Sequence, residues 1–231
     1  MIAHLKLLQA ILLPLAFFFA CSVKREPVVK KKNATAHSQQ WQELFDKKSL
    51  EGWKRLELDG EGGEINFADG VIRFARGNPL TAMVIADERF TPPSSTYEMI
   101  LRARKTDGRD FFCALTFPVP EKETCATFVA GGWGGGVTGI SNIDNLDANR
   151  NSTRSVIRYQ TGQWYDLRIE VRRDTIRCWV DNRLVVNTVI SGKKISMRPG
   201  KIENCQPLGI ASFATASEFK SLRIRHLPSE N

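Results

Sequence analysis

At 231 residues the chain is long enough to hold one sizeable domain with appendages, and 42% of its side chains are hydrophobic. Its formal net charge is +8, but residues 21–40 contribute +4 and Lys6 contributes +1, which leaves +3 for the rest. This small surplus, without a nucleic-acid-binding module or a basic–aromatic pattern, excludes nucleic acid as the partner.

The N-terminus has the layout of a bacterial secretory signal, because residues 1–6 are positive and the apolar run 7–20 is too short for a transmembrane helix. Cys21 follows a small residue, which resembles a lipoprotein cleavage site, although Phe18 stands where Leu, Val or Ile is usual. We expect 1–20 to be a lipoprotein-type signal peptide and Cys21 to be lipidated, with a plainly cleaved signal as the alternative. Ser22 after the cysteine favours the outer membrane or periplasm of the cell envelope.

Residues 21–40 lack apolar periodicity and are predicted to form a basic flexible tether. The tether either lies against anionic headgroups of the membrane or is a solvated linker.

From Trp41 onward the chain consists of short alternating runs bounded by Gly, Pro, Asn and Asp, with no long helical periodicity. We expect strands at 65–67, 71–75, 82–85, 97–104, 111–117, 127–130, 137–143, 156–159, 164–171, 176–180, 184–188, 208–213 and 219–227. Many short strands at regular spacing predict an all-β fold, a sandwich or barrel, in one domain over 41–228. No repeat of fixed period occurs, which argues against a propeller.

Alternation along these strands separates a core face from an outer face. The predicted core set includes Tyr97, Met99, Leu101, Ala103, Tyr165, Leu167, Ile169, Val171, Ile176, Cys178 and Val180. The outer set carries Glu98, Arg102, Arg168, Glu170, Arg177 and Trp179. A sheet face that mixes charges with an aromatic is either solvated surface or the wall of a binding cleft.

Four cysteines follow Cys21, and an exported protein meets an oxidising compartment that permits disulfides. We predict a disulfide between Cys113 and Cys125, which flank a proline-rich turn, with four buried free thiols as the alternative. The cysteine spacing does not match a zinc site, so we predict no metal role for them.

The stretch 125–153 is the most informative for function. Five glycines surround Trp133, which suggests a tight turn that presents the indole. A run rich in amides, hydroxyls and carboxylates follows, and an aromatic platform beside such groups suits a sugar. We therefore expect a saccharide ligand bound by Trp133, Ser141, Asp147, Asn149 and Asn151, with Arg102, Arg168 and Trp179 from the outer sheet face. A glycine-rich hairpin with a solvated loop is an equally good interpretation.

The same loop resembles the start of a calcium site, because Asn145, Asp147, Asn149 and Asn151 recur at every second position. Arg150 and Val156 stand where an EF-hand needs glycine and glutamate, so an EF-hand is excluded. We predict no cofactor, and a different calcium site stays open as an alternative.

Three segments resemble the bacterial family called 3-keto-disaccharide hydrolase. They are LFDKKSLEGWK at 44–54, GQWYDLRIEVRRDTIRCWVDNRLV at 162–185 and PLGIASFATASEFKSLRIRHL at 207–227. The resemblance implies a concanavalin A-like jelly-roll β-sandwich with a saccharide-directed function, often on exported or lipid-anchored proteins.

Cleavage of a 3-keto sugar starts at the acidified C2 proton and needs a general base, a stabiliser for the enolate and an acid for the leaving oxygen. The three histidines lie in the signal, in the tether and at the end of the last strand, so carboxylates are the better candidates. We predict Asp110, Asp144 and Glu170 as catalytic acids or bases and Arg109 as an enolate stabiliser. Paired carboxylates would equally serve ordinary glycoside hydrolysis.

The predicted function is therefore that of an exported, lipid-anchored hydrolase of 3-keto-glycosides. The alternatives are a non-catalytic saccharide-binding module and a protein-interaction module.

Overall fold

The computed structural model describes residues 40–45, 48–59, 62–87, 90, 93 and 96–228. The predicted signal peptide, the lipidation site Cys21 and nearly all of the predicted tether lie outside the described residues. In the part of the chain that is described, no helix has the length and apolar composition needed to cross a membrane.

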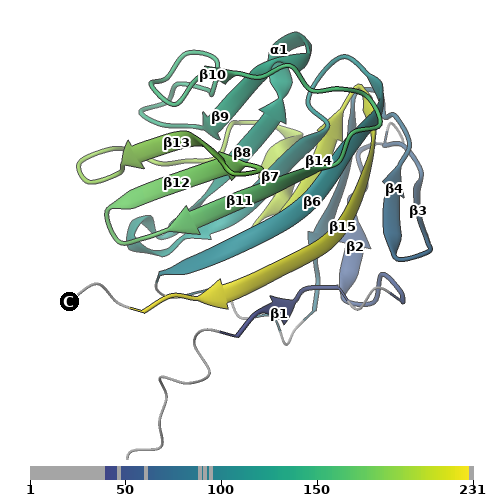
Figure 1. Ribbon diagram of the computed structural model, residues 1–231, viewed down its shortest axis with the longest axis horizontal. Helices are drawn as coiled ribbons and strands as arrows, with labels where there is room; N and C mark the ends of the chain where they lie inside the picture. The colour runs from purple at the N-terminus through teal and green to yellow at the C-terminus, as the bar shows by residue number, and fades with distance from the viewer. Residues whose placement is uncertain are drawn as a thin grey trace, which may run out of the picture. The chain divides into compact units, whose positions relative to one another are not determined.

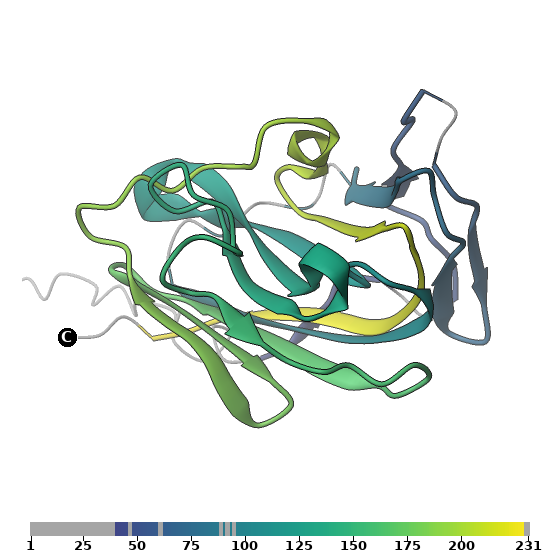
Figure 2. The same cartoon turned by 90° about the horizontal axis from the view of Figure 1, so that it is seen from above.

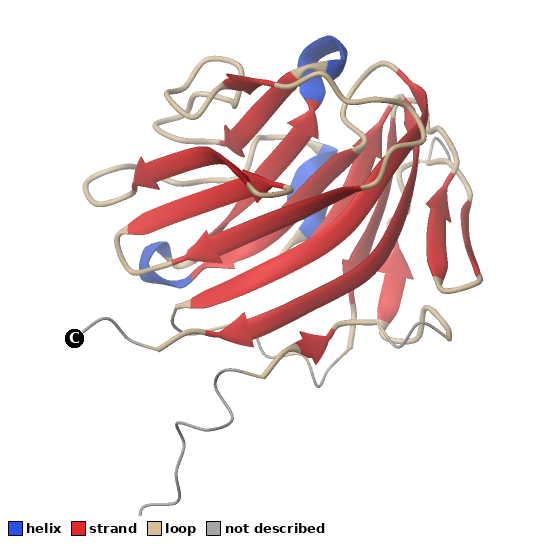
Figure 3. Cartoon of the chain, viewed as in Figure 1, coloured by secondary structure: helices blue, strands red, loops and turns tan. Residues whose placement is uncertain are grey.

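The described domain is a sandwich of two antiparallel sheets, as Figures 1 and 3 show. The larger sheet runs in the order β13 (Arg183–Val189), β12 (Thr175–Val180), β11 (Tyr165–Val171), β6 (Tyr97–Gly108), β15 (Thr215–His226), β4 (Val71–Phe74) and β3 (Ile65–Ala68), and β1 (Gln42–Glu43) also pairs with β15. The smaller sheet runs in the order β10 (Ser155–Val156), β9 (Val137–Ser141), β8 (Thr124–Gly131), β7 (Cys113–Val119), β14 (Gly209–Phe213), β5 (Leu80–Ile85) and β2 (Trp53–Arg55). The described helical segments are short: η1 (Pro120–Lys122), α1 (Gly132–Gly135) and η2 (Lys201–Cys205). The predicted all-β sandwich is confirmed.

The main hydrophobic core lies between the two sheets, whose layers can be followed in Figure 2. The predicted inward residues of β6, β11 and β12 are all buried, while their neighbours along each strand face outward. The opposing sheet contributes Leu115 and Phe117 of β7, Phe128 of β8 and Ile210 of β14. Side chains from two inner faces that interdigitate in this way are the normal core of a β-sandwich.

The seven-stranded sheet is also buried on its outer face. Every residue of β7 is buried, so neither face of this strand is open to solvent. A second, smaller apolar cluster lies on that outer face, where Leu58 and Cys205 pack with side chains of the sheet itself: Leu80, Ala82, Ala114, Val129 and Ala211. The chain therefore builds a further layer beside this sheet, and the candidate site lies there.

The predicted disulfide between Cys113 and Cys125 is wrong, because the hairpin register keeps the two side chains apart. Cys113 of β7 pairs with Ala130, whereas Cys125 of β8 pairs with Pro118 near the turn. Side chains alternate along a strand, so Cys113 packs into the main core while Cys125 faces the other side of the sheet. All four described cysteines are free and buried, which is the alternative considered above.

We expect these thiols to resist alkylation in the folded protein. Burial raises the pKa of Cys125 to about 11 and that of Cys205 to about 12. Only the thiolate reacts, so iodoacetamide at pH 8 should label Cys125 about a hundredfold, and Cys205 about a thousandfold, more slowly than in the unfolded chain. Labelling of Cys125 should accelerate as the pH rises towards 11. Timed labelling followed by peptide mass spectrometry measures this, and a cross-linked Cys113–Cys125 peptide would contradict the strand register.

Candidate functional site

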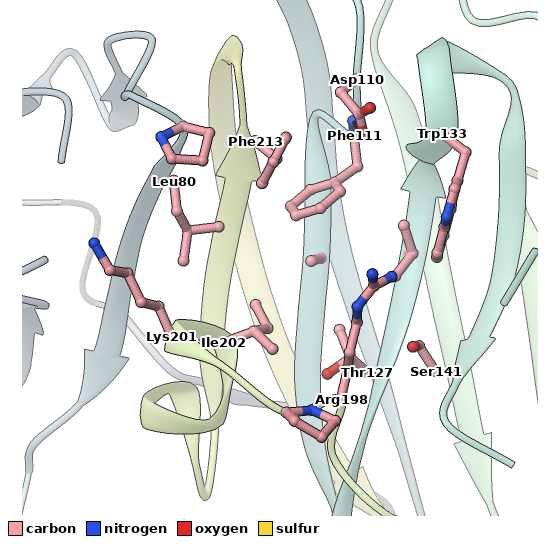
Figure 4. Close-up of a pocket in the computed structure, with 14 residues that line it drawn as sticks. Leu80, Asp110, Phe111, Thr127, Trp133, Ser141, Arg198, Lys201, Ile202 and Phe213 are labelled. Atoms are coloured by element: carbon pink, nitrogen blue, oxygen red, sulfur yellow. Dashed lines mark hydrogen bonds between the residues drawn. The ribbon is translucent and has the colours of Figure 1, made fainter. Parts of the chain in front are cut away.

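A cavity of about 620 Å³ opens on the outer face of the seven-stranded sheet, on the side away from the main core (Figure 4). Its floor crosses neighbouring strands, with Leu80 on β5, Phe213 on β14, Ala114 on β7, Val129 on β8 and Ser141 on β9. Its walls come from residues 110–111 before β7, from α1, and from the segment 198–202 that enters η2. Segments far apart in the sequence therefore meet at one site.

The glycine-rich stretch forms a tight turn that presents Trp133 to this cavity. Gly131 and Gly134 have φ of 81° and 90°, in the left-handed region that glycine adopts without steric cost. Trp133 itself has a φ of 50°, which is costly for a residue with a side chain and therefore needs support from its surroundings. The predicted turn around the indole is confirmed.

Asp110 supplies that support and also lines the cavity. Its Oδ1 accepts a hydrogen bond from the Phe111 amide at 2.8 Å, and its Oδ2 accepts one from the Gly134 amide at 3.1 Å. The backbone of Asp110 is fixed by Thr215, whose hydroxyl accepts from the Asp110 amide and donates to its carbonyl, both at 3.0 Å. A carboxylate oxygen has two lone pairs, so each keeps one for a ligand.

Two cations share the cavity with this carboxylate. Arg198 lies with its guanidinium 5.5 Å from the centroid of the Trp133 ring, a favourable cation–π arrangement. Asp147 is only 8% exposed, and its Oδ2 lies 3.5 Å from Nη1 of Arg198, so it positions that side chain. Lys201 extends its Nζ to within 3.3 Å of the Leu58 carbonyl.

The structure brings together part of the predicted site. Asp110, Trp133 and Ser141 line the cavity, and Asp147 contacts it through Arg198. The Ser141 hydroxyl donates to its neighbour, the side-chain oxygen of Asn142, at 2.7 Å. Arg109 is adjacent in sequence to Asp110 but does not line the cavity.

Three predicted residues of the polar loop stabilise the loop itself and do not line the cavity. Asn151 donates to two backbone carbonyls at 2.7 and 3.0 Å. The side-chain oxygen of Asn149 accepts from Nε of Arg154 at 3.2 Å. Asp144 accepts from the Lys194 amide at 2.9 Å, which ties the loop to the segment after β13. Their composition suggested ligand binding, but these side chains are used for internal hydrogen bonds.

Glu170, Arg102, Arg168 and Trp179 lie on the outer face of the other, eight-stranded sheet, so they cannot join the cavity. The Arg168 guanidinium covers the Trp179 ring at 3.6 Å from its centroid. Glu170 pairs with two arginines at 2.8 and 3.3 Å, and Arg102 pairs with an aspartate at 3.6 Å. This face is a surface network of ion pairs, which also accounts for the position of Trp179.

Sequence reasoning missed several residues that line the cavity: Leu80, Phe111, Arg198, Lys201, Ile202 and Phe213. The sequence did carry a signal for Arg198 and Lys201, because they flank a Pro-Gly pair. Pro-Gly pairs mark turns, so these two cations could have been predicted to lie together on a loop. Phe111 and Phe213 carried no such signal. A phenylalanine on the outer face of a sheet can be a surface residue or a cavity residue, and the sequence does not show which segment covers it.

The loop at 145–151 does not present an open set of calcium ligands. Asp147 is paired with Arg150 and Arg198, each at 3.5 Å, and Asn151 is bonded to the backbone. Within the described residues, no three His, Cys, Asp or Glu side chains gather as a metal site would require.

The chain has the concanavalin A-like jelly-roll fold found in carbohydrate-binding and glycosyl hydrolase-like proteins. It is similar to Crh5 transglycosylase in complex with NAG, with a TM-score of 0.52 and 8% identity over 83% of this chain and 86% of that one. It is also similar to the carbohydrate recognition domain of Emp46p in its metal-free form, with a TM-score of 0.50 and 12% identity over 80% and 93%. A carbohydrate-binding module, CBM66 from Bacillus subtilis, has a TM-score of 0.47 and 14% identity over 75% and 95%.

A family model described as the 3-keto-alpha-glucoside-1,2-lyase-like domain matches residues 40–225. The chain belongs to this family, so the resemblance drawn from the three sequence motifs is confirmed. No curated protein sequence matches the chain.

Proposed function

We propose that the chain cleaves 3-keto-glycosides in the cavity beside the seven-stranded sheet. The observation that carries this proposal is the meeting of Asp110 with Trp133 and Arg198 in one cavity. An indole face covers the apolar side of a sugar ring, a carboxylate can accept a proton, and a guanidinium can stabilise a developing oxyanion. The family description names a 1,2-lyase, which fits a reaction that begins by elimination.

The reaction can be written with these groups alone. The Asp110 carboxylate takes the proton from C2 of the 3-keto sugar, and the Arg198 guanidinium, which lines the same cavity, stabilises the enolate oxygen on C3. The electron pair then forms the C1–C2 double bond as the C1–O bond breaks, and the leaving oxygen takes up the proton that Asp110 removed from C2. Addition of water across the new double bond would release a 3-keto sugar, so lyase and hydrolase outcomes differ only in this last step.

Elimination suits the cavity better than ordinary glycoside hydrolysis does. Hydrolysis uses two carboxyl groups that flank the scissile bond. Among the described residues that line the cavity, Asp110 is the single carboxylic acid. One base beside cations is sufficient for elimination, because the keto group activates the C2 proton.

The cellular setting is part of the same proposal. The signal-like residues 1–20 and the cysteine that follows them support export and lipid attachment at Cys21. We place the enzyme in the cell envelope, at the outer membrane or in the periplasm, where the tether would connect the domain to the lipid.

Replacing Trp133 with alanine should weaken saccharide binding by about tenfold or more, because a buried aromatic contact is lost on one face of the sugar. The full-length chain is assayed on a panel of 3-keto-glucosides by following release of the aglycone. Affinity for the same compounds is measured by calorimetry.

Trp179→Ala is the matched control, since its indole lies on the opposite sheet beneath Arg168. It should leave affinity and turnover unchanged. Absence of turnover on every member of the panel would reject the enzyme, and equal losses in the two tryptophan variants would reject the cavity as the site.

One observation favours a second candidate, a non-catalytic saccharide-binding module. Both carboxylate oxygens of Asp110 accept backbone amides, which is also the geometry of a residue that only fixes a turn. A binding module should bind the panel through Trp133 without cleaving any member of it.

A further inference from the structure

We propose that the cavity is divided into a sugar half and an aglycone half, and that the aglycone half takes an apolar, aromatic group rather than a second sugar. This inference rests on the proposed function, because it names the substrate class of the same site. The division follows from the order of the strands beneath the cavity.

Strand order separates the two halves across the sheet. Ser141 of β9 and Thr127 of β8 lie on one side, next to Trp133 and Arg198, while Leu80 of β5 lies on the other side beyond β14. Figure 4 shows the same separation, with Leu80, Ile202 and Phe213 grouped away from Trp133 and Ser141. We call the first group the sugar half and the second the aglycone half.

The aglycone half is built from apolar groups. The rings of Phe111 and Phe213 lie 5.4 Å apart between centroids and are tilted by 39°, so together they give this half an aromatic surface. Leu80 is 5% exposed and belongs to the apolar cluster beneath, and Ile202 of η2 packs against that cluster from above. A ligand in this half therefore meets carbon on most sides.

Polar partners are scarce in the aglycone half. Among the described residues of this half, Lys201 carries the charge. Its Nζ lies 3.3 Å from the Leu58 carbonyl oxygen and 3.3 Å from Oδ2 of Asp59, so it already has two partners within the protein. A second sugar ring would bury several hydroxyls against Leu80 and Ile202 without partners, which is unfavourable. A flat apolar ring loses nothing there and gains aromatic contact.

The size of the cavity allows both groups at once. Ligand cavities usually have volumes of about 300–1,000 Å³, and this one has about 620 Å³. A monosaccharide placed against Trp133, within reach of Asp110, would leave the aglycone half to be filled by the group attached to C1. The binding energy of the aglycone would then help to hold the C2 proton and the scissile C1–O bond close to the Asp110 carboxylate.

The test compares two 3-keto-glucosides with the full-length chain: one with a phenyl aglycone and one with a glucosyl group in its place. We expect kcat/KM to be at least about tenfold higher for the phenyl compound. Ile202→Ala should lower kcat/KM for the phenyl compound by about tenfold and leave the glucosyl compound nearly unchanged. Leu184→Ala is the matched control, because Leu184 is 47% exposed on β13 of the other sheet.

Affinities of both compounds, measured by calorimetry, separate this inference from the proposed function. Without turnover of either compound, a phenyl preference in affinity that Ile202→Ala removes would support the subsite and reject the enzyme. Turnover of both compounds with equal kcat/KM would keep the enzyme and overturn the subsite. Equal affinities without turnover, or a loss in Ile202→Ala that is the same for both compounds, would also overturn it.

Discussion

Replacing Asp110 with asparagine is expected to lower kcat/KM for 3-keto-glucosides by about a hundredfold to ten-thousandfold, while the protein remains folded. An amide cannot accept the C2 proton, although its size is the same. Asparagine keeps an oxygen for the Phe111 amide, so only the 3.1 Å hydrogen bond from Gly134 is lost, which costs roughly 1 kcal/mol. Steady-state kinetics and thermal unfolding of the variant measure the two effects separately.

Asp144→Asn is the matched control for this experiment. Asp144 was an equal candidate from the sequence, but its carboxylate bonds to the Lys194 amide outside the cavity. It should therefore keep full turnover. If Asp110 only stabilises the turn around Trp133, Asp110→Asn should give a different pattern. The indole would be displaced, and the affinity for 3-keto-glucosides would fall together with turnover. Lost kcat with retained affinity supports the base, and an active Asp110→Asn protein would remove Asp110 from that role.

Most of the fold could be predicted because alternation records which face of a strand is buried. In β11 and in residues 97–103 of β6 every second residue is apolar, and the predicted inward sets are buried. The strands β1 and β2 were missed, since two or three residues are too few for a pattern to appear. β6 also extends beyond its apolar pattern to Gly108, because Lys105 and Asp107 still pair with β15.

The site was predictable only where local composition carried the signal. The glycines around Trp133 mark a turn that presents the indole, whereas Asp110 was one of several carboxylates that the sequence did not rank. Arg198 and Ile202 come from a segment about sixty residues later in the sequence, and only tertiary packing brings them over the same sheet. The same limit explains the error at Cys125, because pairing register cannot be read from spacing alone.

The outer face of the eight-stranded sheet shows how cross-strand register turns an apparent cleft wall into a structural network. Glu98 is 2% exposed, although it belongs to the outward set of β6. Register places it between Glu170 of β11 and Arg225 of β15. Its Oε1 lies 3.1 Å from Arg168, and its Oε2 lies 2.5 Å from Arg225. Removing the Glu98 carboxylate would therefore leave the guanidinium groups of Arg168 and Arg225 without this partner.

Glu98→Ala should therefore lower the free energy of unfolding by about 3 kcal/mol, at the lower end of the range for a broken buried pair, because both arginines are about one-third exposed. The unfolding midpoint should fall by about 6–12 °C.

Asp166→Ala is the control. Asp166 pairs with Arg102 at 3.6 Å, and both side chains are about half exposed, so the loss of unfolding free energy should stay below about 1 kcal/mol. Denaturant titrations of both variants decide the matter, since equal losses would mean that burial gives Glu98 no special role. Turnover per folded molecule should be unchanged in both variants, because this face lies on the opposite sheet from the cavity and serves the stability of the sandwich.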